Sequence, residues 1–333
     1  MSGHYPASET VHAALSLATR APSLHNTQPW RWRVGPRSVH LFAEPSLHLE
    51  HTDPDGRDLI ISCGIALNHC VVALAASGWQ SKIHRLPNPE EPDHLASVEF
   101  HPYPPGNTDI ALAAAIPRRR TDRRHYSTRL VPPGHVALMG ARAARMGVTM
   151  RRVEMDDEFR SVLARAAREH QQDAGYLREL RSWSGRHAAT AGVPARNTPI
   201  SEPNALMPAR AFAAPALSQP AEPAEPAAEA DRGVLLALGT LADDTVARLR
   251  AGEGAGQVLL SATSMGLASC ILTEPLEIPT TRRVLQTSIF GDDVFPQILL
   301  RVGWAPADAA PLPPTPRRPL HEVACRLDGR PFG

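Results

Sequence analysis

Apolar residues recur along this chain at the two spacings that distinguish helices from strands. Positions three or four residues apart, with capping or breaking residues at the ends, predict helices over residues 10–20, 58–76, 109–116, 133–145, 156–183, 243–265 and 280–286. Alternating or short continuous apolar positions predict strands over residues 30–34, 39–42, 81–85, 96–101, 148–153, 234–238 and 297–302. Gly35 and Pro36 separate the first two strands, which predicts a hairpin.

Three details of this pattern predict local structure. Asp58 is placed to cap the long apolar helix that ends before Gly78. The glycine-rich stretch from Gly252 to Gly256 predicts a break in the helix that contains it. The residues after the last strand form a proline-rich tail in which no element is predicted.

The composition describes an ordinary globular chain with enough residues for a large core. It has 333 residues, 43% hydrophobic and 21% charged, and a net charge of +1. This length predicts one large unit or two fused units, and the balanced charge argues against general nucleic-acid binding. Ser62, Asn68 and His69 interrupt the most apolar stretch, so a buried helix is a better interpretation than a membrane span.

The N-terminus and the cysteines predict the compartment. Residues 1–20 contain no apolar run of the kind that a secretory leader has. The four cysteines form no CxxC pair and have no zinc-like spacing with histidine. We therefore expect reduced structural thiols, no metal site and a cytoplasmic protein.

The stretch from Gly185 to Asp231 is rich in proline and alanine. It is too long for an ordinary connector, which leaves two interpretations, a disordered insertion or a functional lid. A lid would lie over a site through a few apolar anchors, for which Leu206, Met207 and Phe212 are the candidates.

The first candidate site is a polar loop between the first helix and the first strand. It has the sequence Pro22-Ser23-Leu24-His25-Asn26-Thr27-Gln28-Pro29-Trp30. A hydroxyl and two amide side chains on a short loop suit a flat heterocycle with alternating hydrogen-bond donors and acceptors. The alternative is a structural turn in which Asn26 bonds its own backbone.

The second candidate site is the run from Arg118 to Arg124, which contains five arginines. Guanidinium groups bind phosphate bidentately, and two or three such contacts at roughly 1.5–3 kcal/mol each would supply most of a micromolar affinity. A solvated basic loop and a nucleic-acid patch are the alternatives. The second is disfavoured because Tyr126 is the only aromatic residue nearby and the sequence pI is about 7.9.

Two weaker candidates lie in the second half. The small-residue turn Gly266-Leu267-Ala268-Ser269-Cys270-Ile271-Leu272-Thr273-Glu274-Pro275 would let backbone approach a ligand closely. The tail contributes the pair Arg317 and Arg318. The glycines at 252, 254 and 256 imitate a dinucleotide fingerprint, but they lie within a predicted helix and not after a strand, so a Rossmann site is rejected.

Together these segments resemble the nitroreductase superfamily. The loop at 22–30 is similar to its PSxxNxQPW flavin loop, and Arg119 to Arg123 is similar to its RxS-type phosphate motif, with Thr121 in place of serine. Here the phosphate motif follows the loop, whereas it precedes the loop in ordinary nitroreductases. This order resembles that of the actinobacterial Acg subfamily, to which the segments at 53–57, 61–64, 176–183, 266–268 and 316–320 are also similar.

The resemblance implies an α+β nitroreductase-like fold in which the two subunits of a homodimer are fused into one chain. Residues 1–107 would form the half with the flavin loop, and residues 108–333 the half with the phosphate site, with 185–231 as the lid. The chain would be a monomer, as an internal pseudo-dimer, and would bind one FMN where a family homodimer binds two.

The resemblance also implies which residues contact FMN. They are Ser23, Asn26 and Gln28 for the ring or ribityl chain, Arg119, Thr121 and Arg123 for the phosphate, Thr273 and Glu274 near N5, and Arg317 or Arg318 as a further phosphate contact. His25 replaces a small polar residue of the family loop, and its role is open.

Two functions are consistent with this resemblance. In the first, NAD(P)H reduces the flavin and a small electron acceptor reoxidises it, so that the flavin carries the chemistry and no catalytic side chain is required. In the second, the protein sequesters or stores FMN and the lid blocks nitroreductase activity. A basic interaction module that uses Arg118 to Arg124 is a third and weaker hypothesis.

Overall fold

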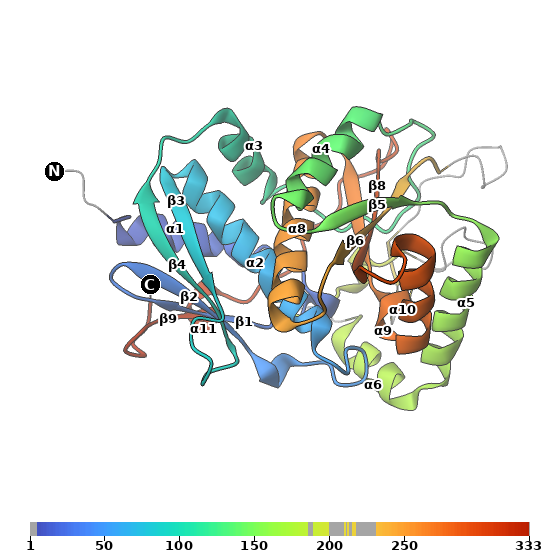
Figure 1. The fold of residues 1–333 in the computed structure, drawn as a ribbon, viewed down its shortest axis with the longest axis horizontal. Coiled ribbons are helices and arrows are strands. Elements are labelled where there is room, and N and C mark those ends of the chain that lie inside the picture. The colour runs from blue at the N-terminus through green and yellow to red at the C-terminus, as the bar shows by residue number, and fades with distance from the viewer. Residues whose placement is uncertain are drawn as a thin grey trace.

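Two β-sheets are built from the alternating apolar residues, and two long helices lie between them (Figure 1). The computed structural model describes residues 5–185, 189–199, 210, 212, 215–217 and 231–332. Leu206 and Met207, two of the three expected anchors, lie outside the described residues. The combination of largely antiparallel sheets with separate helices confirms the α+β class.

The first sheet has five strands in the order β3-β4-β2-β1-β9. Its strands are β1 (Trp30–Val34), β2 (Ser38–Ala43), β3 (Trp79–Arg85), β4 (His94–Pro102) and β9 (Ala324–Arg326). The predicted hairpin is confirmed, with Trp32 paired to Leu41. β9 lies parallel to β1, with Ala324 opposite Trp32, so the tail supplies an edge strand that the sequence analysis missed.

The second sheet has four antiparallel strands in the order β5-β6-β8-β7. They are β5 (Thr149–Val153), β6 (Val234–Thr240), β7 (Ala268–Leu272) and β8 (Phe295–Gly303). Every residue of β6 is buried, as its continuous apolar sequence predicts for a central strand. β7 is the small-residue stretch that the sequence analysis treated only as a turn.

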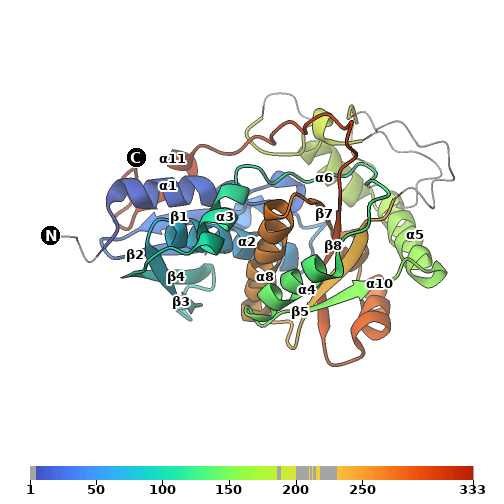
Figure 2. The ribbon, with the colours of Figure 1, turned by 90° about the horizontal axis from the view of Figure 1, so that it is seen from above.

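Ten helices of the described residues surround and separate the sheets (Figure 2). They are α1 (Ser8–Ala18), α2 (Arg57–Ala76), α3 (Asn107–Ala115), α4 (Pro133–Ala144), α5 (Asp157–Gln172), α6 (Ala174–Trp183), α8 (Thr245–Ser264), α9 (Glu274–Glu277), α10 (Pro279–Leu285) and α11 (Leu320–Val323). The helix predicted over 156–183 is in fact two helices. Asp173 separates them and accepts hydrogen bonds from the backbone amides of Gly175 and Tyr176, which caps α6.

The contact between α2 and α8 joins the two sheets into one core. A Cβ atom on Gly64 would lie 2.2 Å from the carbonyl oxygen of Leu249, and one on Gly252 would lie 2.1 Å from that of Ile61. The predicted break at Gly252 to Gly256 is therefore wrong, because α8 is continuous and its glycines serve close helix packing instead.

The helix α2 is long and apolar enough to cross a membrane, with a mean hydropathy of 2.1 in its most apolar window. Of that window, 78% is buried inside the protein, so the expectation of a buried helix is confirmed. The cap predicted at Asp58 is wrong. The carboxyl group of Asp53 takes that role, and its oxygens accept hydrogen bonds from the amides of Asp58 at 3.0 Å and Leu59 at 2.8 Å.

Candidate functional site

The polar loop between α1 and β1 has an unusual backbone conformation. His25, Asn26 and Gln28 have φ angles of 45°, 56° and 57°, although none of them is glycine. A short turn, η1 (Leu24–Asn26), sits at its centre, and the Ser23 hydroxyl accepts a hydrogen bond from the Gln28 amide at 2.9 Å. Such strain persists only where surrounding contacts hold it, and it is concentrated at functional sites.

Two amide side chains tie this loop to segments far away in the sequence. Asn26 donates from Nδ2 to the carbonyl oxygens of Gly192 at 3.0 Å and Pro316 at 3.1 Å. Gln28 donates from Nε2 to the carbonyl of Thr190 at 2.9 Å and accepts at Oε1 from the Arg318 amide at 2.8 Å. These contacts hold the 185–231 segment and the tail against the loop.

A pocket opens beside the loop where these segments meet. Its lining comes from both halves of the chain, the 185–231 segment and the tail, and consists of Pro22, Ser23, Asn26, Arg119, Arg120, Thr121, Arg123, Val193, Asn197, Thr315 and Arg317. The structure thus brings six of the expected FMN contacts to one pocket. They are Ser23, Asn26, Arg119, Thr121, Arg123 and Arg317.

The arginines at and beside this pocket lack negative partners among the described residues. Within the described part of the chain, no carboxylate forms an ion pair with Arg20, Arg119, Arg120, Arg123 or Arg317. The Nε atoms of Arg20, Arg119, Arg120 and Arg317 are buried and have no hydrogen-bond acceptor among the described residues. Arg119 is buried and the other four are partly buried, and cations withdrawn from water in this way are normally paired, so the cluster favours an anion.

The pKa values of the guanidinium groups reflect the same imbalance. Burial, together with Arg120, Arg20 and Arg123, lowers the pKa of Arg119 to about 10. Burial, together with Arg119, Arg20 and Arg120, lowers that of Arg317 to about 9. An anion bound among these groups would favour their charged forms and offset the repulsion.

The remaining expected contacts lie outside this pocket. Arg318 directs its side chain toward Glu322, with Nε 3.6 Å from Oε2, so only its backbone amide reaches the loop. Of the pair considered in the tail, Arg317 is therefore the pocket residue. Gln28 does not line the pocket either, because its side chain is fully buried within the loop.

Thr273 and Glu274 lie in a second buried polar cluster. The Thr273 hydroxyl accepts a hydrogen bond from Arg210 at 3.1 Å, and Glu274 contacts His170 Nδ1 at 3.3 Å. Arg210 belongs to the 185–231 segment and also contacts Nε2 of His25 at 3.0 Å. Burial, together with Arg210 and Arg123, lowers the pKa of His25 well below 6.5, so this imidazole is neutral at pH 7.

Phe212, one of the three expected anchors, contacts both the polar loop and the arginine run, and its role in a lid stays a prediction. Its ring packs edge-on against His25, with centroids 6.0 Å apart, and the guanidinium of Arg123 lies 5.0 Å from its centre. The 185–231 segment therefore contacts both the polar loop and the arginine cluster through described residues. Arg210 and Asn197 take part in the same contacts, and the sequence analysis missed them because an apolar-anchor search does not find polar residues.

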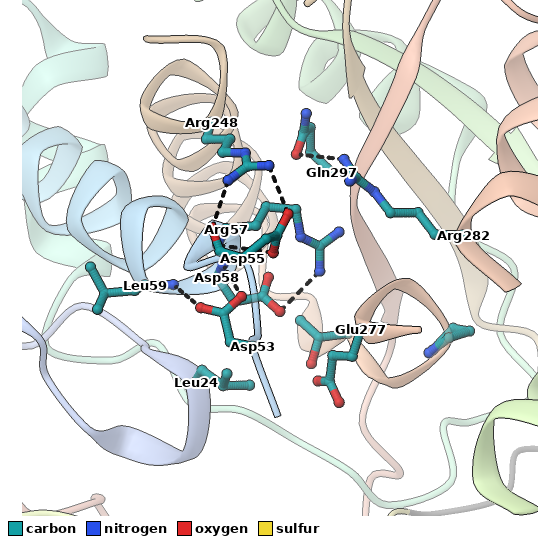
Figure 3. Close-up of polar contacts among 12 residues, drawn as sticks. Leu24, Asp53, Asp55, Arg57, Asp58, Leu59, Arg248, Glu277, Arg282 and Gln297 are labelled. Atoms are coloured by element: carbon teal, nitrogen blue, oxygen red, sulfur yellow. Dashed lines mark hydrogen bonds and ion pairs between the residues drawn. The ribbon is translucent and has the colours of Figure 1, made fainter. Parts of the chain in front are cut away.

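A third group of charges surrounds the start of α2 (Figure 3). Arg57 donates to Asp58 at 2.9 Å, and both side chains are buried. Burial and the neighbouring Asp58 raise the pKa of Asp53 to about 8. Arg248 joins this region to α8 through Asp55 at 2.7 Å, which adds a polar contact to the α2–α8 interface. Among the described residues, no group of three or more His, Cys, Asp and Glu side chains is placed to hold a metal ion.

The pocket on this α+β scaffold is thus lined by a strained polar loop and by arginines that form no ion pair with the described carboxylates. No protein-family model matches the chain. The Mycobacterium tuberculosis (strain H37Rv) protein Rv3131, which bears the provisional name NAD(P)H nitroreductase, is 57% identical over 325 residues. This match covers 97% of this chain and 93% of that protein. The Acg protein of the same strain, which bears the same provisional name, is 36% identical and covers 95% of each chain.

Comparison with solved structures gives a weaker likeness. A Bacteroides fragilis nitroreductase with bound FMN is 14% identical, with a TM-score of 0.39, and the match covers 60% of this chain and 90% of that one. The family assignment rests on the mycobacterial relatives. The chain belongs to the nitroreductase family, and Acg is among its relatives, as the order of its motifs predicts.

Proposed function

We propose that this chain binds one FMN, with the phosphate among Arg119, Arg120, Arg123 and Arg317. The observation that carries the proposal is the set of buried arginine Nε atoms that have no acceptor among the described residues. A phosphate dianion supplies acceptors and charge for such groups. The isoalloxazine ring would lie along the polar loop, toward His25 and Asn26.

The function supported best is an FMN-dependent oxidoreductase that takes reducing equivalents from NAD(P)H and passes them to a small electron acceptor. Bound FMN supplies the redox chemistry. The residues of this chain bind and orient it: the arginines hold the phosphate, and Ser23 and Asn26 present polar atoms at the pocket wall. The nitroreductase names of the relatives support the reaction class.

A second candidate function is sequestration of FMN. It is favoured by the contacts of Arg210 and Phe212 with His25, which bring the 185–231 segment against the loop that the ring would contact. Anaerobic mixing of the FMN-loaded protein with NADPH separates the two functions. Loss of flavin absorbance within seconds supports the oxidoreductase, and no loss supports sequestration.

The same proposal includes the division of the chain into two halves, its oligomeric state and its location. Residues 1–107 and 108–333 act as the two halves of a fused pseudo-dimer, and a monomer then suffices to bind FMN. The meeting of Ser23 from one half with Arg119 from the other supports this division. All four cysteines are unpaired, which supports a reducing cytoplasm as the location.

The phosphate assignment is tested by comparing FMN with riboflavin, which lacks the phosphate. We expect the purified protein to bind FMN far more tightly, and Arg119→Gln to weaken FMN by roughly 30-fold, or about 2 kcal/mol, without changing riboflavin affinity. Arg118→Gln is the matched control, because Arg118 is exposed and lies outside the pocket. Equal affinities for FMN and riboflavin would show that the arginines do not bind the phosphate.

A further inference from the structure

The guanidinium of Arg210 lies in a buried site formed by four side chains. Nη2 donates to Oε1 of Glu277 at 2.5 Å and to the Thr273 hydroxyl at 3.1 Å, and Nη1 lies 3.0 Å from Nε2 of His25. The carbon at its centre is 5.8 Å from the middle of the Tyr176 ring. We call His25, Tyr176, Thr273 and Glu277 the Arg210 site.

The walls of this site are held by elements that do not include residue 210. His25 lies in η1, Tyr176 in α6 and Glu277 in α9, and Thr273 directly precedes α9. The Tyr176 ring stacks on His170 of α5, with centroids 3.9 Å apart and planes 6° from parallel. The site is therefore a feature of the folded scaffold, and Arg210 is its occupant.

Glu277 favours a cation at this position. Its side chain has no exposed surface, and its Oε2 has no hydrogen-bond donor among the described residues, with Nε2 of His170 at 3.7 Å. Burial raises the pKa of Glu277, and Asp58 adds to the increase, while Arg210 opposes it. Figure 3 shows the Glu277 side chain near Arg57 and Asp58. Without a cation the site would hold a buried carboxylate that is costly to ionise.

The geometry selects a flat cation over a compact one. Both terminal nitrogen atoms of the guanidinium contact the scaffold, Nη1 at His25 and Nη2 at Glu277, which lie on different elements. The Tyr176 ring lies within cation–π distance. An ammonium group is a point charge and does not reproduce this planar fork. The neutral imidazole of His25 is suited to accept a hydrogen bond from such a cation.

We propose that the Arg210 site is a binding site for a planar organic cation, of the amidinium or guanidinium class, and that Arg210 occupies it when no such ligand is bound. A ligand that enters displaces Arg210 and releases its contact with His25. Because Arg210 is part of the same chain, its high effective concentration weakens the ligand's apparent affinity in the wild-type protein. The site shares His25 with the loop along which we place the flavin ring, so its test uses flavin-free protein.

Benzamidine and its neutral analogue benzamide test the site directly. Isothermal titration calorimetry of the flavin-free Arg210→Ala protein should give benzamidine at least tenfold tighter binding than in wild type, and at least tenfold tighter binding than benzamide. Glu277→Gln in the Arg210→Ala background should remove the preference for benzamidine. Equal binding of the two compounds to Arg210→Ala, or a preference that survives Glu277→Gln, would overturn the proposal.

A second variant covers the case in which Arg210→Ala does not fold. Arg210→Lys keeps a positive charge beside Glu277 but loses the planar fork, so benzamidine should displace it at least threefold more readily than it displaces Arg210. The absence of any preference for benzamidine over benzamide in Arg210→Lys would likewise overturn the proposal. Both measurements use flavin-free protein, so their outcome is separate from that of the FMN and riboflavin comparison.

Discussion

The side-chain carbonyl of Gln28 accepts a hydrogen bond from the backbone amide of Arg318 at 2.8 Å, although 290 residues separate them. This bond fixes the tail next to the polar loop. It thereby places Arg317, the residue before Arg318, at the pocket. The C-terminal arginine that we assign to FMN is thus positioned by the loop assigned to the same ligand.

Replacement of Gln28 by leucine should therefore cost stability and flavin affinity together. The variant removes the partners of the Arg318 amide and the Thr190 carbonyl oxygen, both of which lie in partly buried hydrogen bonds, so we expect the free energy of unfolding to fall by about 1–2 kcal/mol. Urea unfolding measures this change. Gln80→Leu on the exposed face of β3 is the control, and equal losses in the two variants would show that the Gln28 bonds contribute nothing specific.

Alanine at Gly64 should disrupt the contact between α2 and α8. Its Cβ atom would lie 2.2 Å from a backbone carbonyl oxygen, which no side-chain movement can relieve, so we expect a loss of about 3 kcal/mol or failure to fold. Gly134→Ala is the matched control, because a Cβ atom there meets nothing within 4 Å and should stabilise α4 by about 0.5–1 kcal/mol. Similar melting temperatures for both variants would contradict this packing.

Arg119→Gln should have opposite effects on the empty and the loaded protein. In the absence of FMN it removes a buried charge that no described carboxylate neutralises from a cluster of like charges, so its melting temperature should equal or exceed that of wild type. The further increase that FMN produces should be smaller than in wild type. A variant that melts lower without FMN, but gains as much from FMN as wild type, would identify Arg119 as a structural residue.

The raised pKa of Asp53 predicts how stability depends on pH. Its folded-state pKa is about 8, above the roughly 3.9 of an exposed aspartate, so between about pH 4 and pH 8 the folded protein retains a proton that the unfolded chain releases. This contribution to stability is complete below about pH 4 and is lost as the pH rises to about 8.

Asp53→Asn cannot titrate, so its free energy of unfolding should improve relative to wild type as the pH rises across that window. The limit of this improvement is about 1.4 kcal/mol per pH unit. Urea unfolding at pH 5 and pH 8 measures it, with Asp292→Asn, an exposed position, as the control. A difference between Asp53→Asn and wild type that stays constant with pH would refute the assignment.

The sequence predicts those parts of the fold and site that depend on neighbouring residues. The hairpin at Gly35 and the polar loop at 22–30 follow from local spacing and turn chemistry, and both are present. The strand β9 has three residues and no apolar period long enough to detect, and it exists because β1 offers a free edge. The glycines of α8 predict a break in that helix when the sequence is considered alone. Their role in packing is evident only once α2, with Gly64 opposite them, is in place.

In the candidate site, too, the sequence predicts what depends on neighbouring residues and misses what depends on tertiary packing. The arginine run could be found because its members are adjacent in the sequence. Arg20 and Asn197 reach the pocket region only through tertiary packing, and Arg210 reaches His25 across 185 residues. Thr273 and Glu274 illustrate the limit of a resemblance, because their present contacts are Arg210 and His170. Their expected role near the flavin stays a prediction.

The central claim is that one arginine-lined pocket, formed by both halves of the chain, binds one FMN. Titration of the flavin-free protein with FMN, followed by flavin fluorescence at protein concentrations well above the dissociation constant, tests it most directly. We predict a sharp end point at one FMN per chain, with riboflavin unable to displace it at equal concentration. An end point at two FMN per chain, or no saturable binding, would contradict the account.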